Sequence, residues 1–297
     1  MLNIISASAP VTVPAVLACI YSAPGLGKTS MVSTAEAPLL LEFDHGSHRT
    51  RFRCPRHEVT DWREVARLSA DQLAPYSTIV VDTVGRALEY LARELCRTNR
   101  KNQMGSGGLS LQGYGALKSA FALWLGNLRS YGKDVVLLSH ITEKDTEDGH
   151  FVRLDAMGSS ANEIYKSADL MGQILIDRQG GQWLDFSPNP LSFRKDPTGL
   201  SAQQVPHFKD DRTFLARILE QVKEGLKQQS AAAEDEERAE AALEQFRKLA
   251  GPEDFNGALQ KLRAEGAPVA VRKALGTAGK EQGLEFDRDA LVFREAA

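Results

Sequence analysis

The sequence has few cysteines, no long apolar run and no strong net charge. Its three cysteines lie far apart and form no C-x-x-C pair, so they predict neither a zinc site nor a disulfide framework and fit a reducing compartment. No lysine or arginine precedes Lys28, and Pro14 interrupts the first apolar stretch, so no signal peptide is indicated. No run approaches the roughly 20 apolar residues of a membrane-spanning helix. We expect a soluble cytoplasmic protein with no membrane partner.

The weak net charge of -3 excludes little, because basic and acidic regions can cancel. Hydrophobic residues make up 42% of the chain and charged residues 25%, which is ordinary for a globular protein. At 297 residues the chain exceeds the usual size of a single domain. These values predict one large domain with a smaller one attached.

Short apolar runs alternate with helical patterns over the first half of the chain. The runs are nearly continuous, as in strands covered on both faces, and they comprise Val16–Tyr21, Pro38–Phe43, Thr78–Val81, Asp134–Ser139 and Leu170–Ile176. The helical patterns cover Lys28–Ala35, Trp62–Gln72, Gly85–Arg97 and Tyr114–Tyr131. This rhythm predicts an α/β fold with a mainly parallel sheet.

The second half of the chain changes character. Two runs, 173–177 and 183–187, flank a glycine-containing turn and predict a β-hairpin, and a helix is expected from Asp211 to about Gln228. We assign residues 1–229 to the core, 230–237 to an acidic linker or exposed helix start, and 238–297 to a small helical C-terminal domain. The last of these contains no catalytic motif.

A phosphate-binding loop follows the first predicted strand and opens the first predicted helix. It reads Ser22-Ala-Pro-Gly-Leu-Gly-Lys-Thr29, close to the pattern G-x-x-x-x-G-K-[ST] but with serine at the first position. Backbone N–H groups of such a loop bind phosphate oxygens, and the helix N-terminus adds a favourable dipole. We expect ATP or a related nucleoside triphosphate, with Mg²⁺, to contact Ser22, Ala23, Pro24, Gly25, Leu26, Gly27, Lys28, Thr29 and Ser30.

Three residues are predicted to bind the triphosphate or its magnesium ion. Lys28 neutralises the β- and γ-phosphates, and the Thr29 hydroxyl binds Mg²⁺. The run that ends in Asp82 is typical of the strand whose terminal acid holds the same ion through water. The metal prediction is therefore Thr29 with Asp82.

Hydrolysis also requires a group that orients or deprotonates the attacking water. Glu42 and Asp44 lie at the end of the second predicted strand and, being two residues apart, are expected to point to the same side. Asp44 is the first candidate and Glu42 the second. The alternative is that Asp44 caps the turn at Gly46 while His45 is simply solvated.

These features, in this order, resemble the RecA-like ATPases, and most closely the phage-encoded Sak-type single-strand annealing or recombination proteins. The resemblance covers about residues 16–200. The stretch Leu41-Glu-Phe-Asp-His-Gly-Ser-His-Arg49 is similar to the family's strand that ends in its catalytic acid. Val135-Val-Leu-Leu-Ser-His-Ile141 resembles the strand whose last polar residue senses the γ-phosphate. That residue is His140 here, where RecA has glutamine.

The resemblance also implies sites for DNA and for a neighbouring subunit. The segment Gly158–Ala168 is similar to the one that follows the second DNA-binding loop, so the first loop corresponds to Asn99–Gly113 and the second to Thr142–Met157. Arg194 and Lys195 occupy the place at which RecA-like filaments present basic residues to the phosphates of the next subunit.

The charge distribution agrees with DNA binding. From Leu95 to Lys133 there is no acidic residue and there are six basic ones, around a glycine-rich centre. Such a loop can follow a phosphate backbone without reading bases, and Arg97, Arg100 and Lys101 are the candidate contacts. The alternative is a solvated surface loop. A second basic cluster comprises Arg49, Arg51, Arg53 and Arg56, and it suits DNA or a subunit interface equally.

The sequence leads to three hypotheses about function. The first is an ATP-dependent single-stranded-DNA-binding recombination or annealing protein, an ATPase stimulated by DNA that forms an oligomer or filament, in the host cytoplasm if a phage encodes it. The second is a helicase or AAA-type motor with residues 223–297 as a helical lid. The third is a nucleotide-dependent module whose C-terminal domain recruits a single-strand-binding or replication protein. Adenine contacts, base preference and subunit number are left open.

Overall fold

The computed structural model describes residues 12–46, 48, 50, 52–147, 149–287 and 290–296. The chain divides into two compact units, a core from Val13 to Leu226 and a C-terminal unit from Lys227 onward. Each is described by itself below. None of the helices in the described ranges is long and apolar enough to cross a membrane.

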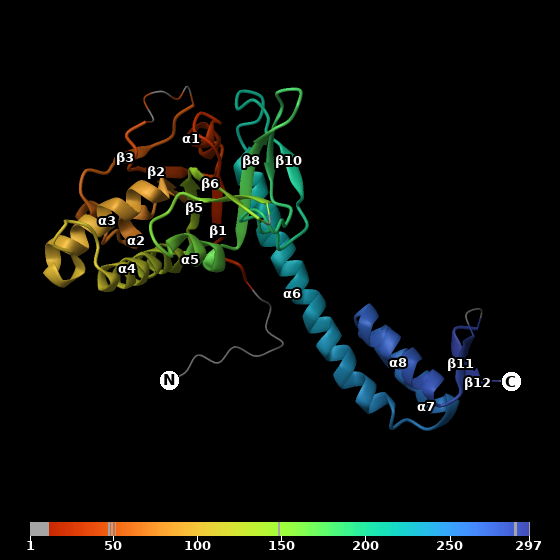
Figure 1. The fold of residues 1–297 in the computed structure, drawn as a ribbon. Helices are drawn as coiled ribbons and strands as arrows, with labels where there is room; N and C mark the ends of the chain where they lie inside the picture. The colour runs from red at the N-terminus through yellow and green to blue at the C-terminus, as the bar shows by residue number, and fades with distance from the viewer. Residues whose placement is uncertain are drawn as a thin grey trace. The chain divides into compact units, whose positions relative to one another are not determined.

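The core is built on one eight-stranded sheet (Figure 1). Five neighbouring pairs are parallel, and antiparallel strands extend the sheet at one edge. The strand order is β10 (Ala202–Gln204), β9 (Gln182–Asp185), β8 (Leu170–Ile176), β1 (Leu17–Tyr21), β5 (Asp134–Ser139), β4 (Thr78–Asp82), β2 (Pro38–Glu42) and β3 (Arg56–Glu58). The predicted α/β fold with a mainly parallel sheet is confirmed, as is the β8–β9 hairpin.

The strand order brings the motif-bearing strand ends together. β5 lies between β1 and β4, and β2 follows β4 on its other side. The register pairs Tyr21 with Ser139 and Asp82 with both Leu138 and Glu42. Because the strands are parallel, their carboxyl ends meet at one edge of the sheet, where ligands bind in open α/β sheets.

Alternate residues of β1 enter two different apolar cores, one on each face of the sheet. Leu17, Cys19 and Tyr21 pack with α3 (Val84–Thr98) and α4 (Leu111–Ser130), which Figure 1 shows packed together. Ala18 and Ile20 pack with α1 (Lys28–Val32) and the beginning of α6 (Phe214–Phe246). The strand is therefore buried on both faces, which explains its continuous apolar sequence.

The predicted helix at 62–72 is wrong. The chain instead forms a 3₁₀ turn, Trp62–Glu64, and a short helix α2, Ala70–Leu73. Asp61 and Ser69 each begin a helical segment with a capping box. Each side chain accepts a backbone N–H of the first turn, and the side chain of the residue three positions later accepts the backbone N–H of Asp61 or Ser69. Two start signals within nine residues favour two short segments.

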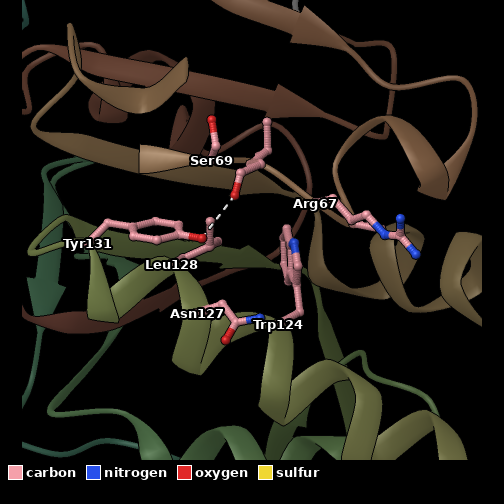
Figure 2. A pocket seen from close by; sticks show the side chains of 8 residues that line it. Arg67, Ser69, Trp124, Asn127, Leu128 and Tyr131 are labelled. Carbon is pink, nitrogen blue, oxygen red and sulfur yellow. Dashed lines mark hydrogen bonds between the residues drawn. The ribbon is translucent and has the colours of Figure 1, made fainter. Parts of the chain in front are cut away.

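The segment between these turns is attached to α4 through backbone carbonyls. Trp124 Nε1 donates to the Val65 carbonyl at 2.9 Å, and the Tyr131 hydroxyl donates to the Leu68 carbonyl at 3.1 Å. A cavity of about 280 Å³ lies beside these bonds, and Figure 2 shows the guanidinium of Arg67 pointing away from the aromatic rings. Both aromatic donors are therefore used in contacts with the backbone of this segment.

Two segments correspond to the predicted DNA-binding loops. The first contains a 3₁₀ turn, Arg100–Asn102, and an exposed loop in which the Met104 N–H donates to the Gly108 carbonyl and the Gly107 N–H donates to the Met104 carbonyl. The second is a two-stranded hairpin, β6 (Ile141–Thr146) and β7 (Gly149–Leu154), which leads to α5 (Ser160–Ser167).

The acidic segment assigned to a linker is helical. Residues 230–237 lie inside α6, which extends from Phe214 to Phe246 and therefore also passes the predicted helix end near Gln228. The segment 226–246 contains no glycine or proline and is rich in alanine and glutamate, both strong helix formers. The high charge density of this stretch favours exposure to solvent, but it does not prevent the backbone from forming a helix.

The C-terminal unit is helical with one addition that the sequence did not predict. It contains α7 (Gly251–Ala264), α8 (Val269–Glu281) and a hairpin of β11 (Leu284–Asp287) with β12 (Val292–Glu295). Its small core includes Phe255, Leu275 and Phe293. The hairpin exists because alternate apolar residues of its two short strands pack against the helices, a tertiary contact that short strands require.

Candidate nucleotide-binding site

The loop between β1 and α1 has the backbone geometry of a phosphate cradle. Gly25 and Gly27 have φ values of 81° and 72°, in the left-handed region that favours glycine. Gly27 directly precedes α1, so the N–H groups of the loop and those of the first turn of the helix are next to each other. The predicted strand, loop and helix are all present in order.

Lys28 is buried and holds the loop from within. Its Nζ donates to the Ser22 carbonyl at 3.0 Å, to Ser22 Oγ at 3.0 Å and to the Ala23 carbonyl at 3.1 Å. Ser22, the departure from the glycine pattern, is itself fully buried and supplies two of these acceptors. Burial lowers the pKa of Lys28 to about 8, opposed by the charges of Asp82 and Asp44.

Thr29 and Asp82 meet where the metal prediction places them. Thr29 Oγ1 donates to Asp82 Oδ2 at 2.7 Å. Burial raises the pKa of Asp82 to about 6; the Thr29 hydrogen bond opposes this shift and the charge of Asp44 adds to it. A hydroxyl and a carboxylate are hard oxygen donors that suit Mg²⁺, an ion that takes few protein ligands and completes its shell with phosphates and water. The described residues contain no cluster of three or more His, Cys, Asp or Glu able to hold a metal alone.

The two candidate acids have different surroundings. β2 ends at Glu42, which is buried, with Oε2 at 3.3 Å from Arg56 Nε. Asp44 lies beyond the strand, lines the cavity in front of the phosphate loop and has Oδ1 at 3.6 Å from Arg86 Nε. Strand alternation stops at Glu42, so the expectation that both acids point to the same side stays a prediction. This geometry favours Asp44 as the group that faces a nucleotide.

His140 lies beside the phosphate loop at the end of β5. Its Nδ1 is 3.4 Å from Lys28 Nζ, and its ring lines the same cavity. Burial and the neighbouring Lys28 charge lower the pKa of His140, which favours the neutral ring. A neutral imidazole here can accept or donate one hydrogen bond toward a terminal phosphate.

These groups surround a cavity of about 560 Å³, within the usual range for small-molecule sites. Of the predicted loop contacts, residues 24–30 line it, while Ser22 and Ala23 act from behind through Lys28. The lining residues that the sequence reasoning did not name as site residues include Phe52, His207 and Phe208. The ring of Phe52 is 5.6 Å from that of His207 and 5.7 Å from that of Phe208. Phe52 is far from the other two residues along the chain, so no local sequence pattern indicates that these side chains lie together.

The three predicted DNA contacts differ in freedom. Arg100 and Lys101 are exposed, and within the described ranges no carboxylate forms a salt bridge with either. Arg97 is also exposed but is held by Glu94, with Nη2 at 2.5 Å from Oε2. Arg100 and Lys101 are therefore the better placed for phosphate contacts.

The other predicted basic groups are engaged or lie outside the described residues. Arg194 forms an ion pair with Asp185, and Lys195 Nζ donates to the Ala168 carbonyl at 2.6 Å. Their contact with a neighbouring subunit stays a prediction and requires these bonds to exchange. In the second basic cluster Arg56 pairs with Glu58 and Glu42, while Arg49 and Arg51 lie outside the described residues.

Comparison with known families agrees with this geometry. An AAA domain family matches residues 15–198, more than half of the chain, and the matched range includes the phosphate loop, Asp44, Asp82 and His140. The chain belongs to this family. An AAA-type domain indicates a nucleotide-dependent ATPase with a P-loop fold. No curated protein matches the chain.

Proposed function

We propose that this AAA-family protein is an ATP-dependent single-stranded-DNA-binding protein of recombination or annealing, working as an oligomer or filament. The observation that carries the ATPase part is the hydrogen bond between Thr29 and Asp82 in a cavity that also receives Lys28, Asp44 and His140. This set would supply groups for phosphate binding and metal binding, together with a carboxylate that orients the attacking water and accepts its proton, in one place.

The chemistry follows from the positions of these groups. Lys28 and the loop N–H groups would hold the β- and γ-phosphates, and Thr29 with Asp82 would hold Mg²⁺, which would supply positive charge to offset that of the phosphates. Asp44 orients the attacking water and accepts its proton as the water oxygen bonds to the γ-phosphorus and the bond to the β-phosphate oxygen breaks. His140 hydrogen-bonds the transferring phosphoryl group.

The base of the nucleotide has an apolar surface available. Phe52 and Phe208 both line the cavity and form an edge-to-face ring contact, and a Cβ on Gly27 would lie 4.0 Å from the Phe208 ring. Aromatic side chains offer a nucleobase a stacking surface that does not discriminate strongly between bases. We assign adenine binding to this aromatic group.

The DNA part of the proposal is supported by how the two predicted loops converge. A cavity of about 650 Å³ is lined by Arg93 and Arg97 from α3, by Gln103 from the first loop, and by Tyr114 and Met157. Tyr114 packs closely on Gly158, where an added Cβ would lie 2.8 Å from its ring. The cavity combines two arginines of α3 with the exposed Tyr114 ring and Met157 of the second loop, a combination that suits a single strand of nucleic acid, and Glu89 lines it as well.

The nucleotide cavity and the second predicted DNA-binding loop are connected through the chain itself and through a backbone hydrogen bond. His140 is followed at once by β6, and its carbonyl accepts the N–H of Asp155, just after β7, at 3.0 Å. The Asp155 carbonyl also lies where a Cβ on Gly85, at the start of α3, would come within 2.9 Å. A shift of His140 on loss of the γ-phosphate would therefore move the base of the β6–β7 hairpin.

The test is the ATPase rate with and without single-stranded DNA, followed by electron microscopy of the products. We expect DNA to stimulate hydrolysis and ATP to promote filaments or rings on the strand. Directional unwinding of a duplex would instead favour the AAA-type motor, the second candidate, which the family match supports. ATPase activity without any DNA binding would favour the partner-recruiting module.

A further inference from the structure

The C-terminal unit contains a groove that the nucleotide and DNA proposals do not use. It has a volume of about 720 Å³ and lies among α7, α8 and the β11–β12 hairpin. α8 contributes Arg272, Lys273, Gly276, Thr277 and Lys280, which recur on one face of the helix. One face of α8 thus lines the groove along most of its length.

The floor of the groove is apolar. Leu259, Leu284 and Phe293 are at least nine-tenths buried beneath it, while Val269 and Phe286 are partly exposed at its sides, with exposed fractions of 57% and 39%. A Cβ placed on Gly276 would meet nothing within 4 Å, so the groove is open down to the α8 backbone at this point. Space and apolar surface are both present for an inserted side chain.

The rim of the groove is basic. Four cations line it, Arg263, Arg272, Lys273 and Lys280, and no carboxylate does so in the part of the chain that the structure describes. Of the acids nearby, Glu281 pairs with Arg247, and Asp287 pairs with Arg294. Within the described ranges none of the four cations forms a salt bridge, so their charge is available to a ligand.

We propose that this groove binds a short acidic peptide segment of a partner protein, with one bulky apolar side chain of the segment seated on the floor. The basic rim complements acidic residues on either side of that anchor, and the groove volume is in the range of sites that enclose side chains or small ligands. The proposal stands on the C-terminal unit alone and does not depend on ATP hydrolysis.

A nucleic acid strand fits the groove less well. Strands that bind without base pairing stack on successive exposed ring faces. Here the rings of Phe286 and Phe293 are 5.2 Å apart at an interplanar angle of 62°, and Phe293 is buried. One partly exposed ring over an aliphatic floor offers no row of stacking faces, so the apolar anchor of a peptide is favoured.

The experiment is a fluorescence-anisotropy titration of the full chain without nucleotide. The probe is a labelled peptide in which Asp and Glu residues flank Leu-Phe. A peptide with Gly-Ser in place of Leu-Phe, and a labelled oligothymidylate, are the comparison probes. We expect the Leu-Phe peptide to bind, and the Gly-Ser peptide to bind at least about tenfold more weakly because the buried anchor is lost.

Three variants separate groove binding from general charge attraction. Gly276→Leu adds a side chain at a position where the Cβ has open space around it, and it should weaken peptide binding about tenfold or more by filling the groove. Lys273→Glu should weaken it about fivefold by placing like charge at the rim. Lys261→Glu is the matched control, because Lys261 is exposed on α7 outside the groove, and it should change binding by less than about twofold. Thermal melts establish that each variant is folded.

Several outcomes would overturn the proposal. They are no binding of the Leu-Phe peptide at millimolar concentration, equal effects of Lys273→Glu and Lys261→Glu, or binding that Gly276→Leu leaves unchanged. Oligothymidylate binding that is lost in the groove variants would assign the groove to nucleic acid. Concentration-dependent self-association abolished by Gly276→Leu would assign it to a second copy presenting the acidic residues 234–237.

Discussion

The nucleotide cavity and the C-terminal groove place charged groups in opposite ways. In the cavity Lys28 and Asp82 are buried, and each is hydrogen-bonded to another part of the site. In the groove Lys273 and Arg272 stand at an exposed rim and form no salt bridge within the described ranges. Buried polar groups with fixed partners recognise one geometry, whereas exposed cations over an apolar floor accept many sequences of suitable charge.

The difference predicts how each region responds to mutation. Removing one partner of a buried hydrogen-bonded group leaves the other unsatisfied, which costs much more than losing an exposed charge pair. Changes in the cavity should therefore have large and specific effects on turnover. Changes in the C-terminal unit should be graded and should leave the chemistry intact.

The largest effect is expected for Lys28→Ala. The variant loses the cation that faces the phosphates, so kcat/KM for ATP should fall by at least about 10²-fold, as when a preorganised charge-stabilising donor is removed. Steady-state ATPase assays and nucleotide-induced shifts in melting temperature measure this. Lys248→Ala, an exposed lysine near the end of α6, is the control and should retain wild-type turnover. Equal activity of both variants would contradict the assignment of the phosphate loop.

Asp44→Asn should retain Mg²⁺-ATP binding while hydrolysis falls by roughly 10²–10⁴-fold, because the amide cannot accept the proton of water. Glu42→Gln is the matched comparison. Glu42 is buried against Arg56, so its change should lower stability first, with turnover following the folded fraction. Single-turnover kinetics together with urea unfolding separate the two. If Glu42→Gln stops chemistry in a stable protein and Asp44→Asn does not, the two roles are reversed.

Phe255→Ala should unfold the C-terminal unit selectively. Phe255 is fully buried, its ring is 5.4 Å from that of Phe293, and removing a buried phenylalanine costs about 3–5 kcal/mol. Hydrogen exchange should show lost protection in α7 and α8 with protection of the core sheet retained. Basal ATPase activity should persist, since the described nucleotide cavity takes no residue beyond Phe208. A simultaneous loss of core protection would show that the two units unfold together.

The basic loop should give a smaller, salt-dependent effect. Replacing Arg100 and Lys101 with Ala should weaken binding of different single strands alike and reduce the salt slope by about 1.4, from about 0.7 for each phosphate contact. Adding Arg97→Ala should change the slope little, because Glu94 already holds that guanidinium. Anisotropy titrations at several salt concentrations, at a fixed nucleotide state, measure both. An unchanged affinity and slope would remove this loop from the DNA site.

The smallest effect concerns Glu281, whose pKa Arg247 lowers from the usual 4.5 through hydrogen bonds between α8 and the end of α6. A depressed pKa means that the pair stabilises the fold above the unfolded pKa and loses this contribution as the pH falls through the folded value. Glu281→Gln should thus lower stability of the C-terminal unit slightly at pH 7 and not at low pH. Paired urea titrations at both pH values measure the difference, and a pH-independent difference would contradict it.

The sequence by itself determined the parts that depend on neighbours in the chain. The apolar runs of β1, β2, β4, β5 and β8 identify buried strands, and the phosphate loop identifies itself because strand, glycines and helix start are contiguous. Asp82 is recognisable for the same reason. Signals of this kind fail at 62–72 and 230–237, where capping residues and helix propensity outweigh the broader patterns.

Only the tertiary structure decided which distant side chains share the nucleotide cavity. The sheet order brings His140 to Lys28, the end of β2 separates Asp44 from Glu42, and Phe52 meets Phe208 across most of the core. In the C-terminal unit, the packing of a short hairpin on two helices creates a groove that no sequence motif predicts. The physical reason is common to both: contacts between residues far apart in sequence depend on the packing of whole elements, which local patterns do not encode.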